Sequence, residues 1–128
     1  MMPDGRHPGF FESFTYAFAG LRAALARERN FKVMLAVGAL ALVAGFVLRL
    51  DALSWVVVVL MIGLVLGAEL FNTAIETVVD HVTPQVHPLA KLIKDLAAGA
   101  VLVISASVAV AGLVIYIRAA LLLWGAGM

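Results

Sequence analysis

The chain has 128 residues, of which 64% are apolar and only 13% are charged, and its formal net charge is +1. Soluble domains carry roughly 25% charged residues, so this composition excludes an ordinary soluble protein and predicts an integral membrane protein. The small net charge, with no basic patch interleaved with aromatic residues, argues against a nucleic-acid partner. The absence of cysteine excludes a disulfide framework, a thiol nucleophile and a thiolate metal site.

The N-terminal part divides into an irregular tail and an amphipathic helix. Residues 1–9 hold two prolines and two glycines and predict the tail. Over residues 10–30, apolar side chains recur at helical spacing and most charged side chains lie off that stripe. This pattern predicts a helix lying in the membrane interface. The apolar stripe comprises Phe11, Phe14, Phe18, Leu21, Ala24 and Leu25.

Three long apolar runs follow, and none contains an ionisable residue. They extend over Val33–Leu48, Ala52–Ala68 and Leu96–Ile117. Because a bilayer core takes roughly 20 helical residues, they predict three transmembrane helices. With their flanking residues we place these helices at 31–50, 52–80 and 89–124. The predicted fold is therefore an all-α integral membrane protein in which residues 1–128 form one membrane-embedded domain.

Orientation follows from the distribution of lysine and arginine. Most basic residues precede the first span or lie between the second and third spans, and only Arg49 and Arg118 fall on the opposite side. The excess of positive charge marks the cytoplasmic side, so we expect a cytoplasmic N-terminus.

Small residues on the third span predict association between copies of the chain. Ala97, Ala98, Gly99 and Ala100 give a smooth surface, and a second small-residue surface follows at Ser105–Gly112. Small side chains let transmembrane helices approach closely. One protomer cannot cover all of this surface, so we expect a homo-oligomer.

A polar stripe continues from the second apolar run. Glu69, Asn72, Thr73, Glu76 and Asp80 stand at offsets 0, 3, 4, 7 and 11, which fall on one face of a helix. A carboxylate entering hydrocarbon costs several kcal/mol unless it is neutralised, paired or bound to a cation. We therefore expect these acids to be paired, to bind a cation or to take part in chemistry.

Further polar residues belong to the same membrane level. Lys91, Lys94 and Asp95 begin the third span, and Glu28 ends the interfacial helix. Carboxylates with an amide suit a hard cation such as Mg²⁺, and a lysine supplies a point charge for phosphate. Such a set is consistent with phosphoryl transfer. Composition and spacing leave three alternatives open, namely a kinase, an ion-conducting assembly and a non-catalytic assembly subunit in which the acids pair with lysines to hold helices together.

The polar stripe and its flanking segments resemble the small prokaryotic diacylglycerol kinase family, whose Gram-positive branch phosphorylates undecaprenol. The resemblance covers nearly the whole chain. The segments that carry it are Phe18–Ala24, Glu28 with Asn30–Lys32, Glu69–Asp80, His87–Lys91 and Lys94–Leu102.

The resemblance implies a homotrimer that uses MgATP to phosphorylate a lipid alcohol in the bacterial inner membrane. It makes Glu69 the general base, and Glu28 and Glu76 ligands of Mg²⁺ on the ATP phosphates. It also implies that Asn72 positions the reacting groups and that the site is shared between adjacent protomers. The remaining nucleotide-site residues that it implies are Tyr16 on the surface helix, Lys94, which neutralises phosphate, and Asp95, which orients Lys94.

The lipid acceptor follows from weaker markers. His87–Pro88 and the segment Asp95–Ala100 with Ala98 resemble the undecaprenol kinase branch, whereas Met34 departs from the histidine common there. We expect undecaprenol as the substrate, with diacylglycerol as the alternative. For Asp80, solvation or pairing is as plausible as a functional role.

Overall fold

A computed structural model describes residues 3–127, and within them the chain forms four α-helices and no strand. The helices are α1 (Phe10–Arg27), α2 (Arg29–Val47), α3 (Ala52–Val82) and α4 (Pro88–Ala126). Three of them, α2, α3 and α4, are long and apolar enough to cross a membrane. The predicted all-α fold with three candidate spans is confirmed.

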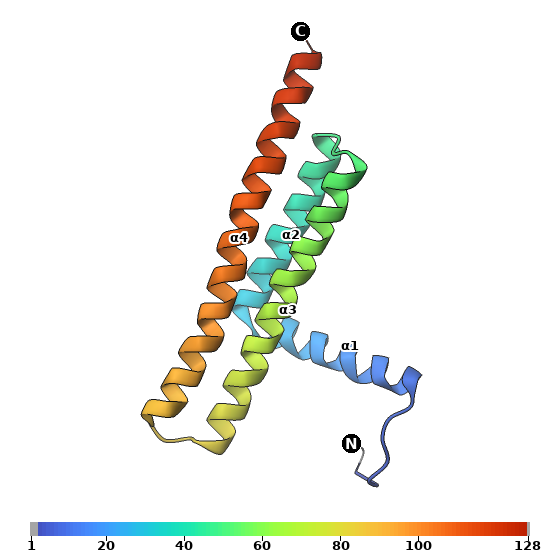
Figure 1. Ribbon diagram of the computed structural model, residues 1–128. Coiled ribbons are helices and arrows are strands. Elements are labelled where there is room, and N and C mark those ends of the chain that lie inside the picture. Colours follow the sequence, from blue (N-terminus) through green and yellow to red (C-terminus); the bar gives the residue numbers. More distant parts are fainter. Residues whose placement is uncertain (1–2, 128) are drawn as a thin grey trace.

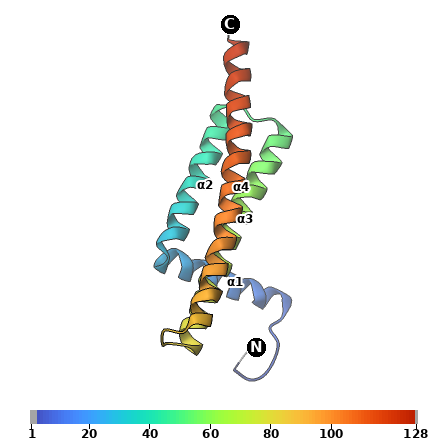
Figure 2. The same cartoon turned by 60° about the vertical axis from the view of Figure 1, so that its left-hand side comes forward.

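The three spans run side by side in alternating directions, and α1 leaves the bundle sideways (Figure 1). Turning the molecule brings α4 to the front with α2 and α3 on either side of it, so the spans form a bundle and not a flat layer (Figure 2). Helix α3 packs most extensively against α4 and less extensively against α2, while α1 contacts mainly α2. Helix α3 is therefore the central element of the protomer.

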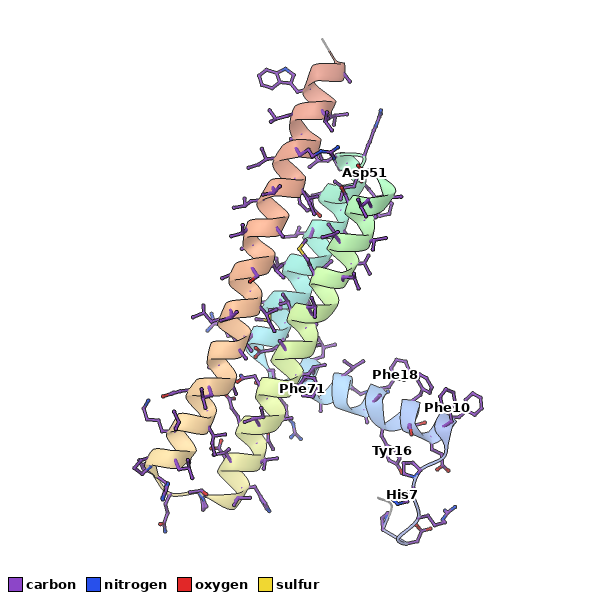
Figure 3. All side chains as sticks on the ribbon, viewed as in Figure 1. His7, Phe10, Tyr16, Phe18, Asp51 and Phe71 are labelled. Atoms are coloured by element: carbon purple, nitrogen blue, oxygen red, sulfur yellow. The ribbon has the colours of Figure 1, made fainter. Side chains whose placement is uncertain are left out.

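Helix α1 is an arm joined to the bundle by a break at Glu28. This residue is extended (φ −100°, ψ 110°) and caps the end of α1 and the start of α2. The arm ends at Arg27, three residues earlier than the sequence pattern predicts. Phe18 and Tyr16 lie on opposite sides of the arm, with Phe18 on the side nearer the level of the spans (Figure 3). This division is the one expected of a helix in the membrane interface.

The turn between α2 and α3 is tight and specified by its residues. Arg49 has a positive φ of 54°, the left-handed conformation that glycine adopts most easily. Asp51 begins α3 by accepting a hydrogen bond from the Ser54 backbone N–H at 2.8 Å. Gly45 faces Trp55, and a Cβ there would lie only 2.7 Å from the indole ring. These features place the ends of α2 and α3 in close contact.

The loop between α3 and α4 also has defined ends. His87 caps α4, because its Nδ1 accepts a hydrogen bond from the Leu89 backbone N–H at 3.1 Å. Pro88 follows at the first position of the helix, where a missing N–H has no cost. At 1.5 Å per residue, the 31 residues of α3 extend roughly 46 Å, which is longer than a hydrocarbon core of roughly 30 Å. One end of α3 at least must therefore extend beyond the hydrocarbon, and we expect it to be the end that carries the acids.

The apolar residues are distributed as in a membrane protein. The buried core cluster comprises only Leu50, Val58, Met61 and Ala119. Most large apolar side chains point outward from all three spans, which suits lipid or another copy of the chain as their neighbour.

Candidate functional site

The buried polar residues lie on α3, on the stripe singled out from the sequence. Among the described residues, Glu69 and Asn72 are the buried polar or charged residues, with exposed fractions of 3% and 9%. Phe71, between them in sequence, is 74% exposed and lies near the junction of α1 with the bundle (Figure 3). The protomer thus buries an acid and an amide while leaving a phenylalanine outside. Such an arrangement costs several kcal/mol unless the polar groups have partners or a ligand.

Two further carboxylates surround Glu69. Glu76 stands two helical turns along α3, and Glu28 comes from the break between α1 and α2. Both lie close enough to Glu69 to interact with it electrostatically, and the Asn30 side chain also interacts with it. Three acids from two elements therefore meet where the arm joins the bundle. Like charges this close repel one another unless a proton or a cation compensates them.

Asn72 has an amide oxygen without a partner. Its Nδ2 donates a long hydrogen bond of 3.4 Å to Glu76 Oε1. Its Oδ1 is buried and accepts no hydrogen bond from any described residue. A buried unpaired acceptor costs about 1–3 kcal/mol, so few are retained in folded proteins. This oxygen is available to a ligand or a cation that enters beside Glu76.

The first turns of α4 supply the basic part of the site. Lys94 Nζ donates a hydrogen bond to Asp80 Oδ1 at 2.7 Å. Lys94 is also close enough to Glu76 for an electrostatic interaction. Asp95 pairs instead with Lys91, four residues earlier on the same helix. The expected orientation of Lys94 by Asp95 is therefore not seen, because Asp80 across the helix pair takes that place.

Tyr16 lies apart from these residues in the protomer. It is 52% exposed and projects from the middle of the arm, on the side away from the spans (Figure 3). The structure thus brings together Glu28, Glu69, Asn72, Glu76 and Lys94. It leaves Tyr16 and Asp95 outside this group.

The donor set fits a hard cation only in part. Within residues 3–127, no group of three or more His, Asp or Glu side chains is close enough together to hold a metal ion. Mg²⁺ usually takes one or two protein carboxylates and completes its shell with water and phosphate oxygens. Glu28, Glu76 and the unpaired Asn72 oxygen are compatible with that mode of binding, and they would require a phosphate ligand to complete it.

An apolar hollow of about 350 Å³ lies beside the site, between α2, α3 and α4. Val65 lines it and stands one helical turn before Glu69, so the hollow leads from the acids towards the middle of the bundle. Gly38 on α2 also lines it, and a Cβ there would lie 3.2 Å from Ile62.

The fold and the site define a class of small integral membrane protein. Three helices are long enough to span a bilayer, and one end of the bundle carries carboxylates, an amide and a lysine, which are groups suited to binding a metal ion and phosphate. The model of one protein family, prokaryotic diacylglycerol kinase, matches residues 15–116. The chain belongs to this family, and the resemblance noted in its sequence is confirmed.

Several characterised relatives align with most of the chain. The undecaprenol kinase of Bacillus subtilis (strain 168) is 42% identical over 108 residues, which cover 84% of this chain and 88% of that protein. The diacylglycerol kinase of Synechocystis sp. is 42% identical over 106 residues, covering 82% of this chain and 61% of that protein. The diacylglycerol kinase of Escherichia coli (strain K12) is 36% identical over 88 residues, covering 69% of this chain and 72% of that protein.

The structure adds Asn30 to the site, and it gives Asp80, for which the sequence left pairing and a functional role open, a partner. Asn30 interacts with Glu69, and Asp80 pairs with Lys94. A sequence signal for Asn30 exists, since it is an amide two residues after Glu28 at the start of an apolar run. The pairing of Asp80 depends on the α3–α4 packing angle, which residue spacing does not specify.

Proposed function

We propose that the protein transfers the γ-phosphoryl group of ATP to the hydroxyl of a membrane lipid alcohol. The observation that carries this proposal is the burial of Glu69 and Asn72, beside Glu28 and Glu76, in a protomer whose apolar side chains face outward. Family membership and the kinase names of the relatives support it.

In this mechanism Glu69 acts as the general base. Its carboxylate takes the proton of the lipid hydroxyl as the hydroxyl oxygen attacks the γ-phosphorus, the bond from that phosphorus to the bridging oxygen breaks, and ADP leaves. Lys94, held by Asp80, faces the phosphates with its positive charge. Asn72 orients the reacting groups through its unpaired oxygen. Mg²⁺, held by Glu28 and Glu76, would neutralise phosphate charge.

The acceptor that we propose is undecaprenol, with diacylglycerol as the alternative. The name of the Bacillus subtilis relative supports the first and the names of the other two relatives support the second. The apolar hollow that begins one turn from Glu69 suits the hydrocarbon of either lipid.

The same proposal includes the setting of the enzyme. We place it in the bacterial inner membrane, with residues 1–128 as one domain and the N-terminus and the site on the cytoplasmic side, as the lysine and arginine distribution favours. We expect a homotrimer, because large apolar side chains of all three spans and glycines of α3 and α4 are open in the protomer. Tyr16 and Asp95 remain candidate nucleotide-binding residues that would act in such an assembly.

Transfer of labelled phosphate from ATP to purified lipids tests the function. Protein in detergent micelles is given Mg²⁺ and either undecaprenol or diacylglycerol, and the lipid fraction is counted. Glu69→Gln should reduce transfer by about 10²–10⁴-fold, as for loss of a general base. Glu12→Gln, on the exposed arm, is the matched control and should transfer normally. Wild type that labels neither lipid would instead support a non-catalytic assembly subunit.

A further inference from the structure

A second polar site lies at the opposite end of the bundle. A hollow of about 320 Å³ is formed by the α2–α3 turn and the last turns of α4. Its polar residues are Arg49, Asp51, Ser54 and Arg118, and Leu122 and Leu123 border it on the apolar side. None of these residues belongs to the acidic site. The hollow therefore requires an explanation of its own.

The charges in this hollow do not cancel. Both oxygens of Asp51 are engaged, since Oδ1 accepts from the Ser54 N–H at 2.8 Å and Oδ2 accepts from Arg118 at 3.3 Å. Arg49 forms no ion pair with any residue of the range 3–127. Two arginines and one aspartate therefore line the hollow, and its lining carries an excess positive charge.

Arg49 has a backbone conformation that glycine would adopt more easily. A residue with φ of 54° is strained unless it is glycine, and glycine would satisfy the same turn without strain. The turn itself is closed by backbone hydrogen bonds from Arg49 and Leu50, which glycine at position 49 would preserve. The guanidinium group is the part of Arg49 that glycine could not replace.

We infer that this hollow binds the phosphodiester of an anionic phospholipid in the leaflet opposite the acidic site. Guanidinium groups bind phosphate oxygens through paired, charge-assisted hydrogen bonds. The apolar border at Leu122 and Leu123 provides a surface for the acyl chains. A headgroup that carries its own ammonium, such as phosphocholine, would be repelled by the excess positive charge. The proposal does not depend on the kinase activity.

The two tryptophans of the chain provide a local readout. Trp55 packs against Phe46 beside the turn, with ring centroids 4.7 Å apart, and Trp124 is near the end of α4 and 70% exposed. The protein is reconstituted into phosphatidylcholine vesicles that contain brominated phosphatidylglycerol or, separately, brominated phosphatidylcholine. Bromine quenches tryptophan fluorescence at short range, so the quenching reports which lipid occupies this end.

We expect brominated phosphatidylglycerol to bind about fivefold more strongly than brominated phosphatidylcholine, as one exposed charge-assisted contact would give. Arg49→Gly, which keeps the turn, and Arg118→Gln should each reduce this preference, and the double variant should abolish it. Arg22→Gln, on the arm at the other end, should retain the preference and so separates a local site from bulk charge.

Three outcomes would overturn the inference. They are equal quenching of wild type by the two lipids, an unchanged preference in the double variant, and loss of the preference in Arg22→Gln. Equal quenching of wild type by the two lipids, together with binding of inorganic phosphate that the double variant lacks, would assign the hollow to a soluble anion and not to a lipid. Circular dichroism of each variant confirms that its helices are intact.

Discussion

At the scale of single residues, a substitution of Asn72 can distinguish a functional role of this residue from a structural one. Its buried amide has one long hydrogen bond to Glu76 and an unpaired oxygen, so it contributes little to stability. We expect Asn72→Leu, which has a similar volume, to leave the unfolding temperature in detergent unchanged or higher while reducing phosphate transfer at least about tenfold. A variant that loses stability and keeps activity would show that Asn72 serves packing only.

The ion pair between Lys94 and Asp80 allows a test of which carboxylate positions the lysine. The pair is partly exposed, with 37% of the Lys94 side chain and 64% of the Asp80 side chain accessible, so it should contribute less than about 1 kcal/mol to stability. Lys94→Met should abolish transfer, and Asp80→Asn should raise KM for ATP more than it lowers kcat. Asp95→Asn tests the alternative partner, and because Asp95 pairs with Lys91 we expect a smaller change in KM for ATP than in Asp80→Asn. Equal losses in Asp80→Asn and Asp95→Asn would contradict this assignment.

Arg49 gives a residue-scale prediction for stability. Because its φ of 54° strains any residue with a Cβ, Arg49→Gly should stabilise the protein by about 1 kcal/mol. Chemical unfolding in mixed micelles measures the change. Gly5 also has a positive φ but lies before α1, so Gly5→Ala is expected to leave the stability of the spans unchanged.

At the scale of elements, the start of α3 should respond to pH. The hydrogen bond from the Ser54 backbone N–H, with further contributions from the Ser54 hydroxyl and Arg118, holds the pKa of Asp51 below its usual value. Because the pKa is lower in the folded state, the stabilisation is complete above the unfolded pKa of about 3.9 and is lost as pH falls through the folded value. Asp51→Ala should therefore lower the unfolding temperature at pH 7 and lower it by less near pH 3. Thermal unfolding of both proteins at the two pH values measures this difference, and a gap that widens in acid would contradict it.

The sequence predicts these elements well where the signal is periodic hydrophobicity. The structure forms a long helix at each of the three uncharged runs between Val33 and Ile117. A long apolar run has no stable alternative to a helix in a bilayer, because its backbone groups must be hydrogen-bonded within the segment. A junction between the surface helix and the first span was predicted after residue 30, and the structure places it at Glu28. The periodic pattern of apolar residues does not specify which residue takes the extended conformation, so the position of the break is given only to within a few residues.

The same distinction applies to the site. Glu69, Asn72 and Glu76 share a helical face, so their proximity follows from spacing on one element. Whether Lys94 contacts Asp80 or Asp95 depends on how α4 packs against α3, and the structure selects Asp80. Local spacing therefore predicts which acids share a face of α3, whereas the partner of Lys94 depends on how two helices pack and is not given by spacing.

At the scale of the whole molecule, the arm allows a test of whether a site in the proposed oligomer is shared between protomers. Tyr16 projects away from the acids of its own protomer, whereas those acids lie where the arm joins the bundle (Figure 3). If the arm contributes Tyr16 to a neighbour, a mixture of Tyr16→Ala and Glu69→Gln subunits should be more active than either variant alone. Each variant measured separately after the same mixing procedure is the control. Activity no higher in the mixture would confine each site to one protomer.

The tight turn at residues 48–51 has a consequence for how the chain enters the membrane. This connection is too short to let α2 span the bilayer while α3 remains in water. We therefore expect the two helices to insert together as one hairpin. Moving an isolated charge across a bilayer is costly, and this turn carries two charges of opposite sign, Arg49 and Asp51. The group that must be translocated is therefore small and nearly neutral. Insertion of the first two spans requires no large hydrophilic domain to cross, and a charge reversal at Asp51 would be expected to slow this step.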